Sequence, residues 1–226
     1  MRWLISGGAP LPQSIIHAYR VRGVVMKQGY GMTEVGVNCF TMTVEDAERK
    51  PGSIGKPLMF TSVRVVSPEE TDVAGGQVGE MWIRGPHVSL GYWQNPEATA
   101  QAFREDGWFR TGDLARIDDE GFFFIAGRLK EMFISGGVNV YPAEIEAALL
   151  SHPAVQDAAV LAVPDETWGE VGVAFIVGEV PAEELSQYLA LRLSKYKVPR
   201  RFIFVDALPR TPYGKVVKEE LRRKLG

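Results

Sequence analysis

Trp3-Leu4-Ile5-Ser6-Gly7-Gly8 is a short apolar run that ends in two glycines, close to the start of the chain. Such a run predicts a β-strand that passes into a tight loop. Pro12 is suited to the start of a helix, and Val24-Val25-Met26 predicts a second strand after it. The order strand, helix, strand predicts a parallel α/β segment over residues 1–50. We expect that the chain starts inside this sheet and has lost its earlier strands.

The sequence changes character near Pro51. Residues 51–127 hold short apolar runs separated by glycine and proline, which predict a β-rich subdomain similar to a small barrel. From Arg128 onward the pattern is mixed, with a helix that starts at Pro142 and both strands and helices after it. The predicted fold class is therefore α/β plus α+β.

The composition is that of an ordinary globular protein, because 46% of the 226 residues are apolar and 23% are charged. The net charge of -3 argues against a nucleic-acid partner, since such proteins usually have a basic face. The single cysteine, Cys39, excludes an internal disulfide and a cysteine-rich zinc site, and it favours a cytoplasmic location. No apolar stretch approaches the ~20 residues of a membrane helix, and the three histidines do not cluster.

Two stretches carry residues that packing alone does not explain. In Gly29-Tyr30-Gly31-Met32-Thr33-Glu34 the glycines let the backbone approach a ligand, and the hydroxyl and carboxylate suit a phosphate with Mg²⁺. A plain turn after a strand is the alternative. The second stretch, Leu208-Pro209-Arg210-Thr211-Pro212-Tyr213-Gly214-Lys215, is a stiff loop that presents one lysine. This ammonium could neutralise phosphate charge in a transition state, or it could be an ordinary exposed lysine.

Two further motifs lie between these stretches. Asp113, in Arg110-Thr111-Gly112-Asp113-Leu114, could accept hydrogen bonds from two ribose hydroxyls, although most aspartates in turns only form the turn. The charged run Gly127-Arg128-Leu129-Lys130-Glu131 falls at the predicted domain boundary, where a solvated linker is the alternative interpretation.

Together these segments resemble one family, the adenylate-forming (AMP-binding) enzymes, and within it the acyl-CoA synthetases, in particular the fatty-acid–CoA ligases. The resemblance covers almost the whole chain. It rests on six motifs in order, which are GGAPL at Gly7–Leu11, YGxTE at Tyr30–Glu34, GE(L/I)xxRGPxVxxGY at Gly79–Tyr92, RTGDL at Arg110–Leu114, GRxKE at Gly127–Glu131 and LPxTxxGK at Leu208–Lys215. Any one of these motifs would be weak evidence, but six in this order are specific.

The resemblance implies a domain organisation. Residues 1–127 would be the C-terminal part of the large AMP-binding domain, residues 128–130 its hinge, and residues 131–226 a small mobile α+β domain. Lys130 would be the hinge residue. The loop Ser135-Gly136-Gly137 would bind coenzyme A and line the path of its pantetheine arm.

The resemblance also implies site residues. Tyr30 would stack on adenine, and Asp113 would bind the ribose hydroxyls with Arg128 beside it. The catalytic residues implied are Lys215, Thr33 and Glu34, of which Glu34 would help to hold Mg²⁺. The nucleotide-binding residues implied are Gly7, Gly8, Ala9, Gly29, Tyr30, Gly31, Asp113, Ile125 and Arg128.

The implied reaction has two steps and uses ATP, Mg²⁺ and coenzyme A. A carboxylate attacks the α-phosphate of ATP to give acyl-AMP, and the thiol of coenzyme A then attacks the acyl carbon. The acid cannot be named, although fatty acids are the leading prediction. The family's phosphate loop, which ends in Pro-Lys-Gly, does not occur in this sequence. We therefore expect weak ATP binding and little adenylation by this chain alone, and either a homodimer or a separate N-terminal half as partner.

Other readings remain open. A peptide-synthetase adenylation domain usually has Lys-x-Arg-Gly-x-Arg where this chain has Ser135–Pro142, and luciferase-like oxygenases usually have Lys-Tyr-Lys-Gly there. A non-catalytic binding module is the alternative of a different class. The missing phosphate loop favours such a module, whereas the presence of Glu34, Asp113, Arg128 and Lys215 together argues against it.

Overall fold

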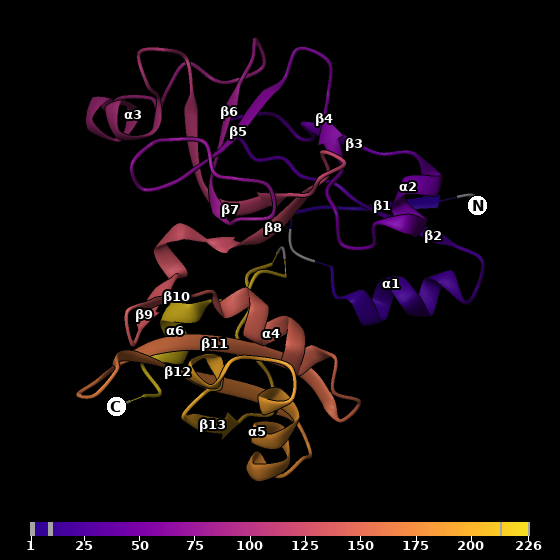
Figure 1. Cartoon of the computed structure of the whole chain (residues 1–226), viewed down its shortest axis with the longest axis vertical. Coiled ribbons are helices and arrows are strands. Elements are labelled where there is room, and N and C mark those ends of the chain that lie inside the picture. The colour runs from indigo at the N-terminus through magenta and orange to yellow at the C-terminus, as the bar shows by residue number, and fades with distance from the viewer. Residues whose placement is uncertain (1–2, 9–10, 213, 226) are drawn as a thin grey trace. The chain divides into compact units, whose positions relative to one another are not determined.

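The computed structural model describes residues 3–8, 11–212 and 214–225. The chain divides into two compact units, Met1–Leu129 and Lys130–Gly226, and Figure 1 follows it through both by colour. The first unit combines a parallel pair of strands with antiparallel sheets, and the second unit packs helices on a mixed sheet. The predicted class of α/β plus α+β is confirmed.

The first unit contains eight strands and three helices among its described residues. Its strands are β1 (Trp3–Ser6), β2 (Val25–Gln28), β3 (Phe40–Thr41), β4 (Lys56–Pro57), β5 (Ser62–Val66), β6 (Gly79–Arg84), β7 (Phe109–Ile117) and β8 (Phe123–Arg128). Its helices are α1 (Gln13–Arg20), α2 (Val44–Arg49) and α3 (Pro96–Ala102).

Strands β1 and β2 pair in parallel through the connecting helix α1, as the opening stretch of the sequence predicted. Strands β5, β6, β7 and β8 form an antiparallel sheet in that order. In the part of the chain that the structure describes, no pairing joins β5 to β8, so this sheet is an open meander and not a closed barrel.

Strand β6 is buried on both faces because a separate group of side chains packs on each face. On one face, Met81 and Ile83 pack with Phe109 and Phe123 in the main core of the unit. On the other face, Trp82 packs with Val66 and Trp108. Four guanidinium groups cover these two tryptophan rings at 4.7–5.9 Å from the ring centroids, where cation–π attraction adds to the packing; they belong to Arg64, Arg84, Arg104 and Arg110.

The second unit begins within a short 3-10 helix, Leu129–Glu131. Its strands are β9 (Phe133–Ser135), β10 (Val138–Val140), β11 (Val155–Asp165), β12 (Gly169–Gly178) and β13 (Arg201–Phe204). Its helices are α4 (Pro142–Leu150), α5 (Ala182–Ala190), α6 (Lys218–Arg222) and a second 3-10 helix, Lys195–Lys197. The sheet order is β10-β9-β12-β11, and β13 adds to β12 in parallel.

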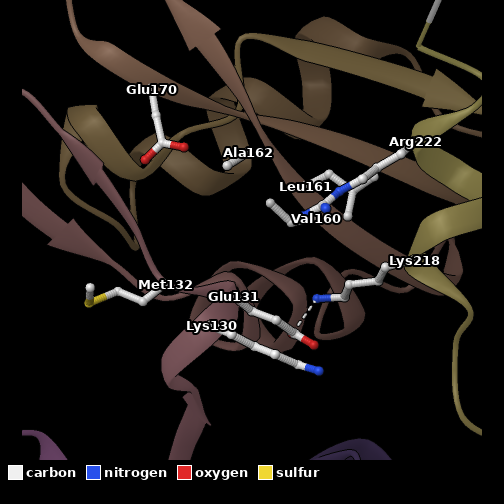
Figure 2. Close-up of a pocket in the computed structure, with 9 residues that line it drawn as sticks. All are labelled: Lys130, Glu131, Met132, Val160, Leu161, Ala162, Glu170, Lys218 and Arg222. Atoms are coloured by element: carbon white, nitrogen blue, oxygen red, sulfur yellow. Dashed lines mark hydrogen bonds and ion pairs between the residues drawn. The ribbon is translucent and has the colours of Figure 1, made fainter.

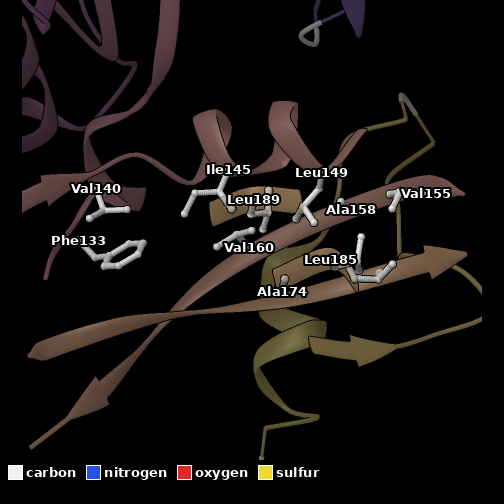
Figure 3. Packing of buried hydrophobic residues seen from close by; sticks show 11 residues of the cluster. Phe133, Val140, Ile145, Leu149, Val155, Ala158, Val160, Ala174, Leu185 and Leu189 are labelled. Atoms are coloured by element: carbon white, nitrogen blue, oxygen red, sulfur yellow. The ribbon is translucent and has the colours of Figure 1, made fainter. Parts of the chain in front are cut away.

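Alternate residues of β11 and β12 point to opposite faces of this sheet, and each face has its own core. On one face, Val160 and Ala174 pack against Ile145 and Leu149 of α4 and against α5 (Figure 3). On the other face, Leu161 and Val173 pack with α6 and the segment before it, through residues that include Leu208 and Leu221. The segment that ends in α6 is therefore fixed to the sheet by apolar contacts.

Among the described residues, no helix has both the length and the apolar content that crossing a lipid bilayer requires.

Candidate active site

The first group of predicted residues lies at the carboxyl ends of β1 and β2. Ser6 and Gln28 are paired as the last residues of these strands, and the Gly29 amide donates a 2.7 Å hydrogen bond to the Ser6 carbonyl. Gly7 and Gly29 lie so close that a Cβ on Gly7 would come within 3.5 Å of the Gly29 carbonyl oxygen. Parallel α/β folds bind ligands at this end of their strands. Gly8 continues the loop, whereas Ala9 lies outside the described residues.

Tyr30, Asp113 and Arg128 form a closely connected group in the first unit. The Tyr30 hydroxyl donates a hydrogen bond to Asp113 Oδ2 at 2.6 Å, across 83 positions of sequence. Arg128 Nε lies 2.6 Å from Asp113 Oδ1. Strands β7 and β8 create this ion pair because Asp113 and Arg128 are opposite each other in their register. The structure thus brings three of the predicted nucleotide-binding residues together.

This group has an unusual electrostatic setting, because Asp113 is only 5% exposed. Burial, together with the adjacent Asp113 carboxylate, raises the pKa of Tyr30 far above its ordinary value. The phenol therefore stays protonated and can only donate to the carboxylate, while Arg128 supplies the compensating positive charge. The Asp113 carboxylate thus accepts from the Tyr30 hydroxyl and lies against the Arg128 guanidinium.

The part of strand β7 just before Asp113 is held by a buried carboxylate that sequence reasoning did not select. Glu80 Oε1 accepts a hydrogen bond from the Gly112 amide at 3.2 Å, and its Oε2 accepts one from Trp82 Nε1 at 2.8 Å. Thr111 adds two bonds, because its hydroxyl donates to the Met81 carbonyl at 2.6 Å and accepts from the Asp113 amide at 3.0 Å. An acidic residue inside the apolar strand Gly-Glu-Met-Trp-Ile was the available signal for Glu80.

Thr33 and Glu34 lie in a tight turn that follows Gly31. The Met32 amide donates to the Gly36 carbonyl at 3.1 Å, and a Cβ on Gly31 would come within 2.4 Å of that same carbonyl oxygen. Thr33 is exposed. Glu34 Oε1 accepts a 2.9 Å hydrogen bond from the Tyr92 hydroxyl, whereas Oε2 accepts none from any residue that the structure describes.

A metal at Glu34 would have to share its ligands with other groups. Within the described parts of the chain, no three acidic, histidine or cysteine side chains come together in a way that could hold a metal ion. One free carboxylate oxygen nevertheless fits Mg²⁺, because this ion commonly uses one or two protein carboxylates together with phosphate and water. Glu34 therefore remains a prediction for Mg²⁺.

Ile125 and Lys130 have different surroundings. Ile125 is paired with Ala115 in the β7–β8 ladder and packs against the main core of the first unit. Lys130 is the first residue of the second unit and is exposed. Its side chain lines a small pocket of about 100 Å³ beside Glu131 and Lys218 (Figure 2).

Lys215 lies at the end of a short hairpin in the second unit. The Thr211 amide donates to the Lys215 carbonyl at 2.8 Å, and the Lys215 amide donates to Thr211 Oγ1 at 3.2 Å. Arg210, which the family motif leaves unspecified, fastens the base of this hairpin. Its guanidinium donates to the Gly214 carbonyl and contacts Asp157 Oδ2 of β11 at 2.6 Å. The Lys215 side chain is exposed at the end of a braced loop.

The loop Ser135-Gly136-Gly137 joins β9 to β10 and lies against Trp168. The Gly136 amide donates to the Trp168 carbonyl at 2.9 Å. Gly136 has φ +58°, and a Cβ there would come within 2.7 Å of the indole ring. The Arg200 guanidinium covers the same ring at 5.5 Å from its centroid. Glycine at this position therefore leaves room for the ring, and Trp168 and Arg200 join the candidate surface.

Comparison with known proteins adds independent evidence. The family model described as AMP-binding enzyme matches residues 1–93, and the one described as AMP-binding enzyme C-terminal domain matches residues 144–215. A feruloyl-CoA synthase from Amycolatopsis sp is 45% identical over 230 residues, which cover 100% of this chain and 47% of that protein. The long-chain-fatty-acid–CoA ligase FadD13 of Mycobacterium tuberculosis is 44% identical over 99% of this chain and 44% of its own length.

Solved structures agree with these sequence relatives. The o-succinylbenzoate CoA synthetase of Bacillus subtilis, in complex with the acyl-adenylate intermediate OSB-AMP, superposes with a TM-score of 0.90. It is 38% identical, and the match covers 98% of this chain and 46% of that one. The chain thus spans about half the length of the relatives it matches.

Proposed function

The chain belongs to the AMP-binding enzyme family, and we propose that it carries the ribose-binding, hinge and lysine-loop parts of an ATP-dependent acyl-CoA synthetase. In this proposal the protein joins a carboxylic acid to coenzyme A through an acyl-AMP intermediate. The relatives described above are named as enzymes that form acyl-CoA or aryl-CoA thioesters. Their chemistry is the reason to test this chain for the same reaction.

The group of Tyr30, Asp113 and Arg128 carries the proposal. The Tyr30 hydroxyl and the Arg128 guanidinium orient this buried carboxylate, and one carboxylate can serve several hydrogen-bond donors at once. Two neighbouring hydroxyls, as on a ribose, match that capacity. The group lies in the same unit as the glycine loops at the ends of β1 and β2, where the backbone can approach a nucleotide closely.

The first proposed step needs positive charge, because a carboxylate oxygen attacks the α-phosphorus of ATP and both reactants are anions. The bond from the α-phosphorus to the bridging oxygen of pyrophosphate breaks as the new bond forms. We assign to Lys215 the role of contacting the carboxylate and the α-phosphate, where its ammonium offsets the charge of the transition state. We assign to Thr33 a hydrogen bond to a phosphate oxygen.

Mg²⁺, when bound at Glu34, would neutralise phosphate charge and orient the pyrophosphate leaving group. Glu34 itself would contribute one carboxylate oxygen, held in place by the hydrogen bond from Tyr92 to the other oxygen. The hydrogen bond from Tyr92 limits rotation of the Glu34 carboxylate.

The second proposed step transfers the acyl group from AMP to the thiol of coenzyme A. Sulfur attacks the acyl carbon, the bond to the AMP oxygen breaks, and AMP leaves. We assign the pantetheine arm to the surface of Ser135, Gly136 and Gly137, with the Trp168 ring beside it. Lys130 would be the hinge about which the second unit rotates between the adenylation step and the thioester step.

The proposed acid substrate comes from one of two classes. Fatty acids are our first choice from the motifs, and aromatic acids are the alternative. The relatives are named for ferulic, long-chain fatty and o-succinylbenzoic acids, so they favour no single class. The assay must therefore offer both fatty and aromatic acids.

Nucleotide binding is the first test, because it does not depend on turnover. We expect AMP to bind the chain in a calorimetric titration, and Asp113→Asn to weaken binding about tenfold to a hundredfold, as for a lost charge-assisted hydrogen bond of roughly 1.5–3 kcal/mol. Asp119→Asn is the matched control, since Asp119 is exposed on a turn of the same unit. Equal affinity of the Asp113→Asn and control variants would refute the ribose assignment.

Turnover is the second test. AMP release is measured with ATP, Mg²⁺, coenzyme A and a mixture of fatty and aromatic acids. We expect Lys215→Ala to abolish whatever release occurs, and Lys224→Ala, an exposed lysine of the same segment, to leave it unchanged. AMP binding without release would instead support a binding module, unless the addition of the N-terminal half of a relative restored turnover.

A further inference from the structure

Lys218 lies between two carboxylates in the second unit, three residues after Lys215. As the first residue of α6, it places its ammonium 2.7 Å from Glu131 Oε2 and 3.1 Å from Glu146 Oε1. Figure 2 shows the Lys218 and Glu131 side chains pointing toward each other in the pocket beside Lys130. One cation thus joins the segment that carries Lys215 to two other segments.

The two carboxylates belong to parts of the unit with different roles. Glu131 immediately follows Lys130, the proposed hinge residue, in the 3-10 helix that begins the unit. Glu146 is on α4, and its Oε1 also accepts a 2.8 Å hydrogen bond from the Val160 amide of β11. The ammonium therefore connects the hinge segment, the main helix and the sheet to the start of α6.

The three side chains are mostly withdrawn from solvent, with 19% of Lys218, 28% of Glu131 and 21% of Glu146 exposed. Burial lowers the pKa of Lys218, but the carboxylates of Glu146 and Glu131 outweigh it and raise that pKa above its ordinary value. Lys218 therefore stays charged throughout the neutral range. An interaction of this kind is costly to break from one side, because the partner carboxylates are left without their cation.

We propose, on the basis of the function proposed above, that Lys218 is a positioning residue that links the hinge to the Lys215 loop. The hairpin at Lys215 is short and internally bonded, and α6 follows it directly. When the hinge segment moves with Glu131, the ion pair carries the start of α6 with it. The loop then follows the hinge as one body, and Lys215 reaches or leaves the phosphate on a defined path.

The other brace of the loop has a different partner. Arg210 pairs with Asp157 of β11, and its side chain is 42% exposed. It fixes the base of the hairpin to the sheet and has no contact with the hinge segment among the described residues. The ion pair between Lys218 and Glu131 therefore connects the Lys215 loop to the hinge segment.

Hydrogen exchange tests this link without any need for turnover. The amides of Thr211, Gly214 and Val217 are bonded within the loop region at 2.8 Å. In Lys218→Met we expect these amides to exchange about tenfold faster or more, while amides of the β11–β12 ladder keep their wild-type rates. Lys218→Arg should restore most of the protection, and Lys224→Met is the control for loss of a nearby surface lysine.

A second variant isolates the hinge side of the link. Glu131→Gln removes the charge of one partner and leaves the pair between Lys218 and Glu146 in place. We expect it to speed exchange in the Lys215 loop by a smaller factor than Lys218→Met. If Glu131→Gln and Lys218→Met both leave loop exchange unchanged, or if exchange rises equally across the whole unit, the proposed link is wrong.

The two half-reactions give a separate readout. Adenylation needs Lys215 at the phosphate, whereas thioester formation from supplied acyl-AMP involves no attack on phosphorus. We expect Lys218→Met to slow acyl-AMP formation about tenfold or more and to slow the thioester step far less, as for an interaction made mainly in one transition state. Equal losses in both steps would argue for a merely structural lysine. If neither the chain alone nor the chain with the N-terminal half of a relative formed acyl-AMP, the proposed function would be wrong, and the exchange test would still decide whether Lys218 links the two segments.

Discussion

The ring and the hydroxyl of Tyr30 make different contacts. Its ring meets Phe40 edge to face, with centroids 5.7 Å apart, while its hydroxyl donates to Asp113. Adenine stacking was the role that the motif implied, and it concerns only the ring. The hydroxyl has the further effect of joining the segment after β2 to Asp113, the residue proposed to bind ribose, so residues of the two predicted motifs are in direct contact.

The raised pKa of Tyr30 gives a pH-dependent prediction. An unfolded tyrosine ionises near pH 10, whereas folded Tyr30 keeps its proton above that pH. The folded state then holds more protons than the unfolded state, so the free energy of unfolding should fall as pH rises above about 10. We expect Tyr30→Phe to flatten this slope in urea titrations at pH 9 to about 11.

Absorbance near 295 nm supplies the matching spectroscopic check, since it follows phenolate formation. The increase seen while the chain is still folded should be the same in wild type and Tyr30→Phe, and Tyr92→Phe serves as the control that removes a more exposed phenol. A smaller increase in folded Tyr30→Phe would mean that Tyr30 titrates normally.

Residue identities could be predicted from the sequence, but their partners could not. Asp113 and Arg128 belong to recognisable motifs, and the β7–β8 register brings them together. Glu80 was not selected as a site residue, because its burial and its bond to the Gly112 amide depend on a strand pairing across 32 positions of sequence. A carboxylate in an apolar strand signals only that some buried partner exists.

At the scale of elements, the turn after β2 depends on Gly31. A methyl group there would lie 2.4 Å from both the Gly36 carbonyl oxygen and the Val37 carbonyl carbon, which are backbone atoms that cannot rotate away. We expect Gly31→Ala to lower the free energy of unfolding by about 1–3 kcal/mol, the usual cost of overpacking. Chemical denaturation followed by tryptophan fluorescence measures this loss.

Gly75→Ala is the matched control for that turn. A Cβ at Gly75 would meet only a side-chain oxygen of Asp119 at 3.4 Å, so we expect a change within about 0.5 kcal/mol. If Gly31→Ala and Gly75→Ala were equally stable, the backbone of the turn after β2 would be able to make room for the added methyl group without a loss of stability. The turn would then not be a rigid support for Thr33 and Glu34.

The elements themselves were predictable to different degrees. Proline at the start of α4 gave that helix a clear beginning, and it begins at Pro142 as expected. Helix α2, capped by Thr43, was missed because it has only six residues and little periodicity. In the last helix the apolar residues Val217, Leu221 and Leu225 recur every four positions, which predicts a helix over all three. The structure has a shorter helix, because α6 covers only Lys218–Arg222 and Leu225 packs on the core from beyond it.

At the scale of the whole molecule, each hydrophobic cluster lies within one of the two units. Because the two units have separate cores, we expect them to unfold in two separate transitions. Leu149→Ala, at a position with 0% exposure in the second unit, should lower the stability of that unit by about 2–5 kcal/mol. We expect calorimetry to show one transition shifted to lower temperature and the other in place.

Leu191→Ala is the control, because Leu191 is 84% exposed and its loss should cost less than about 0.5 kcal/mol. A shift of both transitions by Leu149→Ala would mean that the two cores unfold as one cooperative body. The proposed hinge at residues 128–130 would then need a test of its own, by cross-linking or scattering with and without nucleotide.

The division at Leu129–Lys130 also matters for how such genes can evolve. A recombination event at this codon boundary would pass each core to the offspring protein complete, with all of its packing partners inherited from one parent. A crossover a few dozen codons away, inside the β11–β12 ladder or the β6–β7 ladder, would mix side chains that must fit together. Exchange between related genes should therefore survive selection most often at the point where the chain passes from one unit to the next.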